Sequence, residues 1–224
     1  MISRAAFLAF VLPFCAAIAF AAEPEVQWTG LFDGKTLGGW KKTNFGGETE
    51  ITVKDGVVHF DMGYPLTGLT YNGKLDLPRT DYELSVEAQR VDGSDFFCGL
   101  TFPVGKSYCS FIPGGWGGTT TGLSSINDLD AAHNNTTKYI DYKQGKWYKI
   151  VVRVTDEKIK VWLDKEVIID REIKGEKVGL RNEVSPSRPL GLCSFETKAA
   201  IRNLQIRRLD GKKIAEKEKP DDEE

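Results

Sequence analysis

The sequence predicts an all-β protein, built as a two-sheet antiparallel β-sandwich of the jelly-roll kind. Short stretches in which apolar and polar residues alternate recur along the chain, and a period of two is typical of a half-buried strand. Glycine-rich turns separate about ten to twelve such stretches, and no segment keeps the 3.6-residue period of an amphipathic helix. With 224 residues, of which 41% are hydrophobic, the chain can fill one sandwich core.

The N-terminus, residues 1–21, has the pattern of a signal peptide. Arg4 gives it a positive start, residues 5–19 are apolar, and Ala19-Phe20-Ala21 fits the small-x-small cleavage pattern. This run is short for a membrane span, and no later segment approaches about 18 consecutive apolar residues. We therefore expect an exported protein, periplasmic or extracellular, with no membrane span. Residues 22–209 are predicted to form a single domain and residues 210–224 a charged, disordered tail.

The strands follow in order after an irregular entry segment at 28–40. Asp55-Gly56 is a strong hairpin signal between residues 51–53 and 57–60. Residues 66–77 are expected to form another strand pair or an extended edge, and single strands are expected at 82–91, 147–155, 158–163, 167–169, 190–195 and 200–209. The inward positions of these strands predict a core that contains Leu84, Val86, Leu100, Ile150, Val152, Val161 and Leu163.

The centre of the chain is predicted to be a hairpin followed by a long polar loop. Alternation over 96–102 places Phe96, Cys98, Leu100 and Phe102 on one side, and residues 103–106 form the turn. Residues 113–141 then carry few apolar groups, and Trp116 stands among four glycines. Loops of this length are uncommon in compact domains and often functional. The alternative is a solvated connection in which Trp116 fills a hole.

Two sets of side chains are candidates for binding or catalysis. On the outward strand faces, Trp162 is a candidate sugar platform near Glu83, Glu87, Gln89 and Arg153. The alternative for Trp162 is packing against Lys or Arg stems. In the loops, the candidates are Asp95, Asp128, Asp130, His133, Arg181 and Arg188. We expect Trp116, His133 and either Arg181 or Arg188 to gather at one rim of the sheet face that bears Glu87, Gln89 and Arg153.

Several classes of chemistry have no support in the sequence. The net charge of −2 gives no electrostatic case for nucleic acid, and the chain has no P-loop, nucleophile elbow, dinucleotide fingerprint or zinc spacing. No cofactor is expected, although a Ca²⁺ site made of loop Asp and carbonyl oxygens stays open. For the Cys98 and Cys109 pair, a disulfide and two buried thiols are equal alternatives, and Cys193 has no evident partner. The oligomeric state is not indicated.

The chain resembles the 3-keto-disaccharide hydrolase domain family at four places, which together span nearly all of residues 28–209. Leu31 to Trp40 looks like the family's opening signature, and Val53 to Val58 is similar to its next segment. Residues 146–164 and 201–206 match the pattern of its last strands. The resemblance implies a concanavalin A-like, laminin G-like sandwich in an exported protein that acts on glycosides oxidised at C3.

The family's catalytic pattern is not matched. Members usually carry Gly-x-Glu-x-Gln in the central strand and a His-Gly pair before the final Arg-Asn. This sequence reads Lys106-Ser107-Tyr108-Cys109-Ser110 at the first place and Phe195-Glu196-Thr197-Lys198 at the second. The chain is therefore similar to a divergent branch, and roles must be assigned from its own residues.

Three function hypotheses follow. The first is a hydrolase or lyase on 3-keto-glycosides, in which His133 or Glu87 is the base, Asp130 or Asp95 its acid partner, and Arg153 or Arg181 polarises the ketone. The second is a non-catalytic carbohydrate-binding module of laminin G-like type, with Trp116 and Trp162 as platforms. The third is an assembly domain whose Trp116 loop binds a protein.

Overall fold

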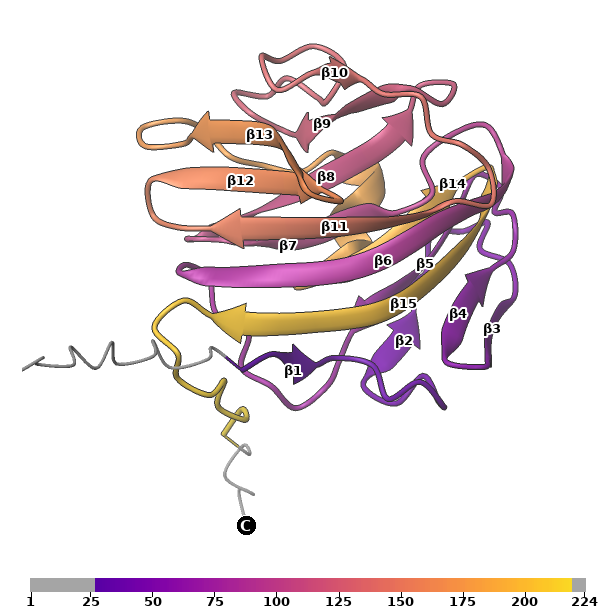
Figure 1. Cartoon of the computed structure of the whole chain (residues 1–224), viewed down its shortest axis with the longest axis horizontal. Helices are drawn as coiled ribbons and strands as arrows, with labels where there is room; N and C mark the ends of the chain where they lie inside the picture. Colours follow the sequence, from indigo (N-terminus) through magenta and orange to yellow (C-terminus); the bar gives the residue numbers. More distant parts are fainter. Residues whose placement is uncertain (1–26, 219–224) are drawn as a thin grey trace, which may run out of the picture.

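The computed structural model describes residues 27–218 and shows two antiparallel sheets packed face to face (Figure 1). The eight-stranded sheet has the order β13-β12-β11-β6-β15-β4-β3, with β1 paired to β15, and the seven-stranded sheet has the order β10-β9-β8-β7-β14-β5-β2. The strands are β1 (Thr29–Gly30), β2 (Trp40–Lys42), β3 (Ile51–Lys54), β4 (Val57–Phe60), β5 (Leu66–Tyr71), β6 (Tyr82–Gly93), β7 (Gly99–Val104), β8 (Ser107–Gly115), β9 (Thr120–Ser124), β10 (Lys138–Tyr139), β11 (Trp147–Val154), β12 (Lys158–Leu163), β13 (Glu166–Glu172), β14 (Gly191–Phe195) and β15 (Thr197–Arg208). Within residues 27–218, the one helical element is the short 3₁₀ helix η1 (Asn182–Ser187). The predicted all-β sandwich is confirmed.

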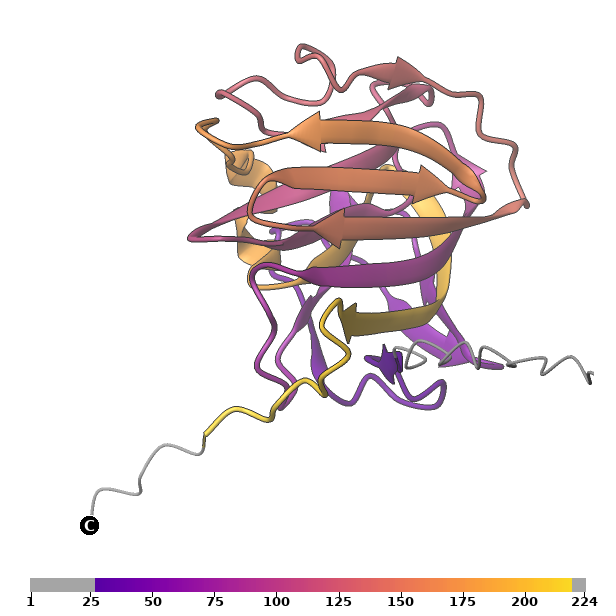
Figure 2. The same ribbon diagram turned by 60° about the vertical axis from the view of Figure 1, so that its left-hand side comes forward.

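The core lies between the two sheets and contains every residue predicted for it. Leu84, Val86, Leu100, Ile150, Val152, Val161 and Leu163 are all buried. Their strands lie in both layers, and Figure 2 shows the long strands of the eight-stranded sheet side by side across the front. Tyr82 of β6 also crosses the core, because its hydroxyl donates to the carbonyl oxygen of Pro103 in β7. Alternation within single strands was therefore sufficient to identify the core.

The central hairpin is confirmed, but its alternation begins later than expected. β7 starts at Gly99, and just before it Phe97 turns into the core while Phe96 stays half-buried on the outer side. The prediction that Phe96 shares a side with Leu100 and Phe102 is therefore wrong. Residues 95–98 are irregular, so the period of two does not extend through them.

The long loop predicted at 113–141 is wrong in its first third. β8 continues to Gly115, and β9 returns along it from Thr120 to Ser124. Leu123 of β9 is fully buried in the core, and the hydroxyl of Thr121 bonds that of Tyr142 at 3.0 Å. Hydroxyl groups that find partners inside the fold allow a polar sequence to form a buried strand.

The three cysteines within residues 27–218 form no disulfide. Facing positions for Cys98 and Cys109 would need Thr101 opposite Lys106, but Thr101 pairs with Ser110 and Phe102 with Cys109. Cys98, Cys109 and Cys193 are free, buried thiols. Burial raises the pKa of Cys109 and of Cys193 to about 12, so these thiols are inert.

In Figure 1 the two ends of the described part of the chain, β1 and the segment that follows β15, lie at the lower side of the sandwich. The signal-peptide prediction, residues 1–21, falls outside the described residues, as does the end of the charged tail. The described part of that tail differs from the disorder expected for it. Ala215 accepts a hydrogen bond from the backbone N–H of Asp76 at 2.8 Å, and the N–H of Lys217 donates to the carbonyl of Lys74 at 2.7 Å. Residues 214–217 therefore run along the loop after β5.

Candidate functional site

The residues expected at one rim lie on two different sheets. Trp116 belongs to the turn between β8 and β9 of the seven-stranded sheet, whereas Glu87, Gln89 and Arg153 lie in β6 and β11 of the eight-stranded sheet. Because the inner faces of both sheets form the core, their outward faces point in opposite directions. The prediction of a single rim is therefore wrong. Assignment to a sheet depends on long-range strand pairing, which alternation within a strand does not reveal.

The outward face of the eight-stranded sheet is occupied by paired charges. The carboxylate of Glu83 is buried and binds both Arg153 and Arg207. Glu87 accepts from Arg202 at 2.8 Å and from Asn203 at 3.0 Å. Burial acts to raise the pKa of Glu87, but the hydrogen bonds from these two donors outweigh it and hold the pKa below its usual value. The carboxylate of Glu87 is thus held by donors from β15.

The other two candidates on this face, Gln89 and Trp162, contact other groups of the protein. Gln89 donates its side-chain amide to the carbonyl of Gly145. The Trp162 ring lies against two cations, with the Arg153 guanidinium 5.2 Å and the Lys160 ammonium 5.6 Å from its centroid. This is the packing alternative considered for Trp162.

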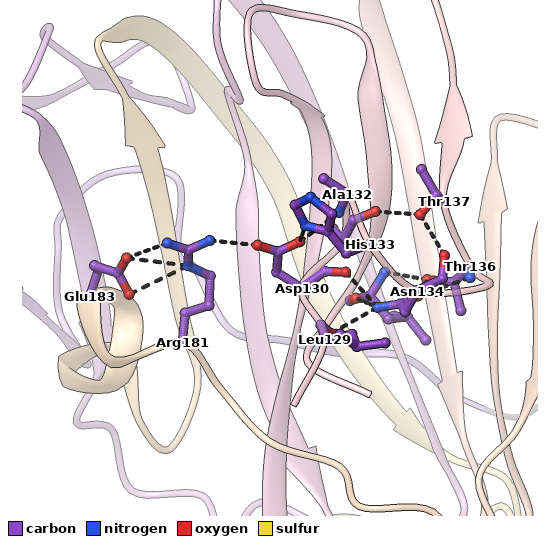
Figure 3. Close-up of polar contacts among 11 residues, drawn as sticks. Leu129, Asp130, Ala132, His133, Asn134, Thr136, Thr137, Arg181 and Glu183 are labelled. Carbon is purple, nitrogen blue, oxygen red and sulfur yellow. Dashed lines mark hydrogen bonds and ion pairs between the residues drawn. The ribbon is translucent and has the colours of Figure 1, made fainter. Parts of the chain in front are cut away.

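A chain of four charged or titratable side chains lies near the seven-stranded sheet (Figure 3). His133 Nδ1 is 2.6 Å from Asp130 Oδ1, and Asp130 Oδ2 accepts from Arg181 at 2.8 Å. Arg181 also binds Glu183, and this pairing lowers the pKa of Glu183. The Asp130 side chain is only 17% exposed, whereas that of His133 is 67% exposed. The sequence-predicted Asp130, His133 and Arg181 are therefore brought together.

The loop backbone fixes the position of this chain of groups. The side-chain amide of Asn134 donates to three carbonyls, those of Leu123, Leu129 and Asp130, at 2.7–3.0 Å. Arg181 follows a segment that pairs with the end of β9, since Ser125 and Gly179 exchange both backbone hydrogen bonds. These contacts hold Asp130 and Arg181 in fixed relation although they are far apart in sequence.

A buried arginine holds the turn that carries Trp116. Arg90, at 6% exposure, donates to the carbonyls of Asp95, Gly114, Gly118 and Tyr142 at 2.9–3.2 Å. The Asp95 carboxylate accepts the N–H of Gly117 at 2.9 Å. Trp116 itself has a φ of 50° and is 44% exposed, so its indole projects from the turn. The Arg181 guanidinium lies 5.9 Å from the centre of that ring.

These elements enclose a pocket of about 360 Å³ on the outward face of the seven-stranded sheet. Asp95, Trp116, Arg181 and Glu183 line it together with an apolar set. The apolar lining residues are Pro65, Leu66, Phe96, Ile112, Val184 and Phe195. Ser124 completes the lining, and its buried hydroxyl has no hydrogen-bond partner within residues 27–218. A concave apolar site with a few converging polar groups is the usual form of a small-molecule site.

Some of the loop candidates line this pocket and others do not. Asp95, Trp116 and Arg181 line it. Asp130 is hydrogen-bonded to Arg181, and His133 is hydrogen-bonded to Asp130. Arg188 does not, because it lies over Tyr108 and donates to the carbonyl of Ser185. Asp128 pairs with Lys177 at the surface.

Sequence reasoning missed Arg90, Phe96 and Phe195. For Arg90 a signal existed, since it continues the inward series Tyr82, Leu84, Val86 and Ala88. A charged residue at an inward strand position demands buried partners.

The described residues show neither a metal site nor a membrane helix. No group of three or more His, Cys, Asp or Glu within 27–218 is placed to hold a metal ion. No helix in the same range is long and apolar enough to cross a membrane.

Comparisons with known proteins agree on a carbohydrate-related fold. The model of the 3-keto-alpha-glucoside-1,2-lyase-like domain matches residues 27–207. No curated protein has a matching sequence. Among solved structures, a putative glycosyl hydrolase from Parabacteroides distasonis is 18% identical with a TM-score of 0.52, over 82% of this chain and 94% of that one. Domain 4 of AbnA, an extracellular arabinanase from Geobacillus stearothermophilus, is 14% identical with a TM-score of 0.50, over 75% of this chain and 82% of that one.

Proposed function

Because the chain belongs to the family of 3-keto-alpha-glucoside-1,2-lyase-like domains, we propose that it is an exported enzyme that cleaves 3-keto-glycosides at the Arg181 pocket. The observation that carries this proposal is the hydrogen-bonded chain from His133 through Asp130 to Arg181, which ends in the pocket wall. It joins a base, an orienting carboxylate and a cationic donor at one place.

A ketone at C3 makes the proton on C2 acidic, so the reaction needs a base that removes this proton. Asp130 accepts from Nδ1 of His133, which leaves Nε2 as the basic nitrogen. Within residues 27–218, Nε2 has no hydrogen-bond partner, and the ring is well exposed. His133 removes the C2 proton, and the electron pair moves onto the C3 oxygen to form an enolate. Asp130 is a positioning residue, because it sets the tautomer and stabilises the imidazolium.

Arg181 stabilises the negative charge that develops on the C3 oxygen. A guanidinium has five N–H donors. Three of those in Arg181 bond Asp130 and Glu183, which leaves two without a partner in the described chain. Donors fixed before the reaction are worth most where charge develops, because they need no reorganisation. The two flanking carboxylates fix this guanidinium in place.

The second half of the reaction breaks the glycosidic bond. The C3 carbonyl forms again, a double bond forms between C1 and C2, and the C1–O bond breaks. The imidazolium of His133 returns its proton to the leaving oxygen, so the products are an unsaturated 3-keto sugar and a free alcohol or sugar. Addition of water across the new double bond would complete hydrolysis. Asp95 lines the pocket and serves as an acceptor for a sugar hydroxyl.

The test is release of free sugar from a 3-keto-α-disaccharide by the purified protein and its variants. We expect His133→Gln to lower kcat by about 10²–10⁴-fold, the usual contribution of a positioned acid–base group. Asp130→Asn should lower kcat and displace the pH profile, since it changes the imidazole's partner. Glu87→Gln is the matched control and should retain full activity, because Glu87 lies on the other sheet. Undiminished turnover by His133→Gln would refute the assignment.

The second candidate is a non-catalytic carbohydrate-binding module. The half-exposed Trp116 ring beside a pocket favours it, since such a ring can cover the C–H face of a sugar. Binding of an unoxidised glycan with no turnover of any 3-keto-glycoside, lost in Trp116→Ala, would support this candidate over the enzyme.

A further inference from the structure

The lining of the Arg181 pocket changes in polarity from one end to the other. The sheet order places β9, β8, β7, β14 and β5 side by side. Ser124 lies on β9, next to the segment that leads to Arg181, and Ile112 lies on β8. Phe195 and Leu66, on β14 and β5, form the far end.

The polar groups that line the pocket belong mostly to its β9 end. Arg181 and Ser124 are there, and the carboxylate of Glu183 binds Arg181. Ser124 is 1% exposed and lines the pocket, and its hydroxyl has no partner within the described residues. A buried hydroxyl without a partner is costly, so a ligand hydroxyl or carbonyl placed against it would be favoured.

At the β14–β5 end, the charged lining residue that adjoins Phe96 is Asp95, and its carboxylate is engaged by the N–H groups of Phe96 and Gly117. Phe96 and Phe195 pack together with their centroids 5.8 Å apart, and both rings are partly exposed. Leu66 and Val184 are buried beside them and belong to the same small apolar cluster. The hydroxyls of a second sugar placed here would lose their water without gaining hydrogen bonds, which is unfavourable. An apolar ring placed here would gain the burial of its surface.

We propose that the pocket selects 3-keto-glycosides whose leaving group is apolar, with an aromatic or bulky alkyl aglycone on Phe96 and Phe195 and the keto sugar against Arg181 and Ser124. This inference rests on the proposed function for the position of the keto sugar. The pocket volume of about 360 Å³ agrees with it, since it is near the lower end of the range of about 300–1,000 Å³ for ligand sites. It suits one sugar ring with a compact aglycone better than an extended oligosaccharide.

The experiment compares KM for 3-keto benzyl α-glucoside with KM for a 3-keto-α-disaccharide. Benzyl alcohol and a sugar alcohol are similar leaving groups, so a difference in KM reports on binding. We expect KM for the benzyl substrate to be at least about tenfold lower, equivalent to about 1.4 kcal/mol. Phe195→Ala should remove most of this advantage, so that the ratio of the two KM values approaches one. Phe45→Ala is the matched control, because Phe45 packs against the same cluster without lining the pocket.

Binding of unoxidised benzyl α-glucoside, measured by calorimetry, separates this inference from the proposed reaction. If the benzyl glucoside binds through Phe195 and no 3-keto-glycoside is turned over, the apolar subsite stands and the proposed enzyme activity fails. If 3-keto-glycosides are turned over with equal KM for benzyl and disaccharide substrates, or with preference for the disaccharide, the apolar subsite is overturned and the activity stands.

Discussion

Replacing Arg90 by Met should destabilise the fold by about 3–5 kcal/mol. The guanidinium is 6% exposed, and it donates to four main-chain carbonyls. A hydrogen bond to a charged group contributes about 1.5–3 kcal/mol, so four independent bonds would add up to more than the expected loss of about 3–5 kcal/mol. The expected loss is smaller than that sum because Trp116, Gly117 and Thr119 are exposed, and water can reach the turn once it is released.

The assay is equilibrium unfolding in urea, with KM for a 3-keto-glycoside as a second readout. Gln89→Met is the matched control, since Gln89 directly precedes Arg90 in β6 but points outward and makes one neutral hydrogen bond. Gln89→Met should lower the free energy of unfolding by about 1 kcal/mol. Arg90→Lys keeps the charge without the planar guanidinium and should fall between the two. The KM of both Arg90 variants should rise, because the turn that carries Trp116 is no longer held. A loss for Arg90→Met no larger than that for Gln89→Met would refute the reasoning.

Two further outcomes follow from the charged and thiol groups. The carboxyl of Glu183 should titrate below its usual pKa, and Arg181→Met should return it toward that value, as followed by carbon NMR. Because the folded pKa lies below the unfolded one, the pairing stabilises the protein above pH of about 4.5, and that stabilisation is lost as the pH falls through the folded pKa. An unchanged Glu183 titration in Arg181→Met would contradict the pairing. A thiol reagent should modify Cys98, Cys109 and Cys193 only after unfolding, and a reductant should leave Tm unchanged. Rapid modification of the native protein, or a drop in Tm on reduction, would contradict the buried free thiols.

The sequence was sufficient for features determined within one strand. Alternation identified β6, β11 and β12 together with their buried residues, and Asp55-Gly56 located the β3–β4 hairpin. It was insufficient where distant segments meet. β14 lies between β7 and β5, which are distant from it in the chain, and this insertion brings Phe195 to the pocket.

The candidate site was predicted in part for the same reason. Its loop residues Asp95, Trp116, Asp130, His133 and Arg181 were recognisable as polar or aromatic groups in irregular segments. The prediction that they share a site with Arg153 was wrong, because the outward positions of the two sheets of a sandwich have similar sequence patterns. Nothing local tells which face will be filled by ion pairs and which will stay hollow.

Small residues explain why the hollow lies on the seven-stranded sheet. A Cβ at Gly191 of β14 would lie 2.6 Å from Cβ of Ser187, and one at Gly68 of β5 would lie 2.3 Å from the carbonyl oxygen of Leu192. Because Gly191 has no side chain, η1 lies close against the sheet, where the Thr70 hydroxyl donates to the carbonyl of Pro186. The helix thereby places Val184 and Glu183 in the pocket wall. The opposite sheet instead has long Arg and Glu side chains that bind one another across its strands, so its face is already occupied. A ligand site needs both an open floor and fixed polar groups, and within residues 27–218 the Arg181 pocket is where the fold supplies the two together.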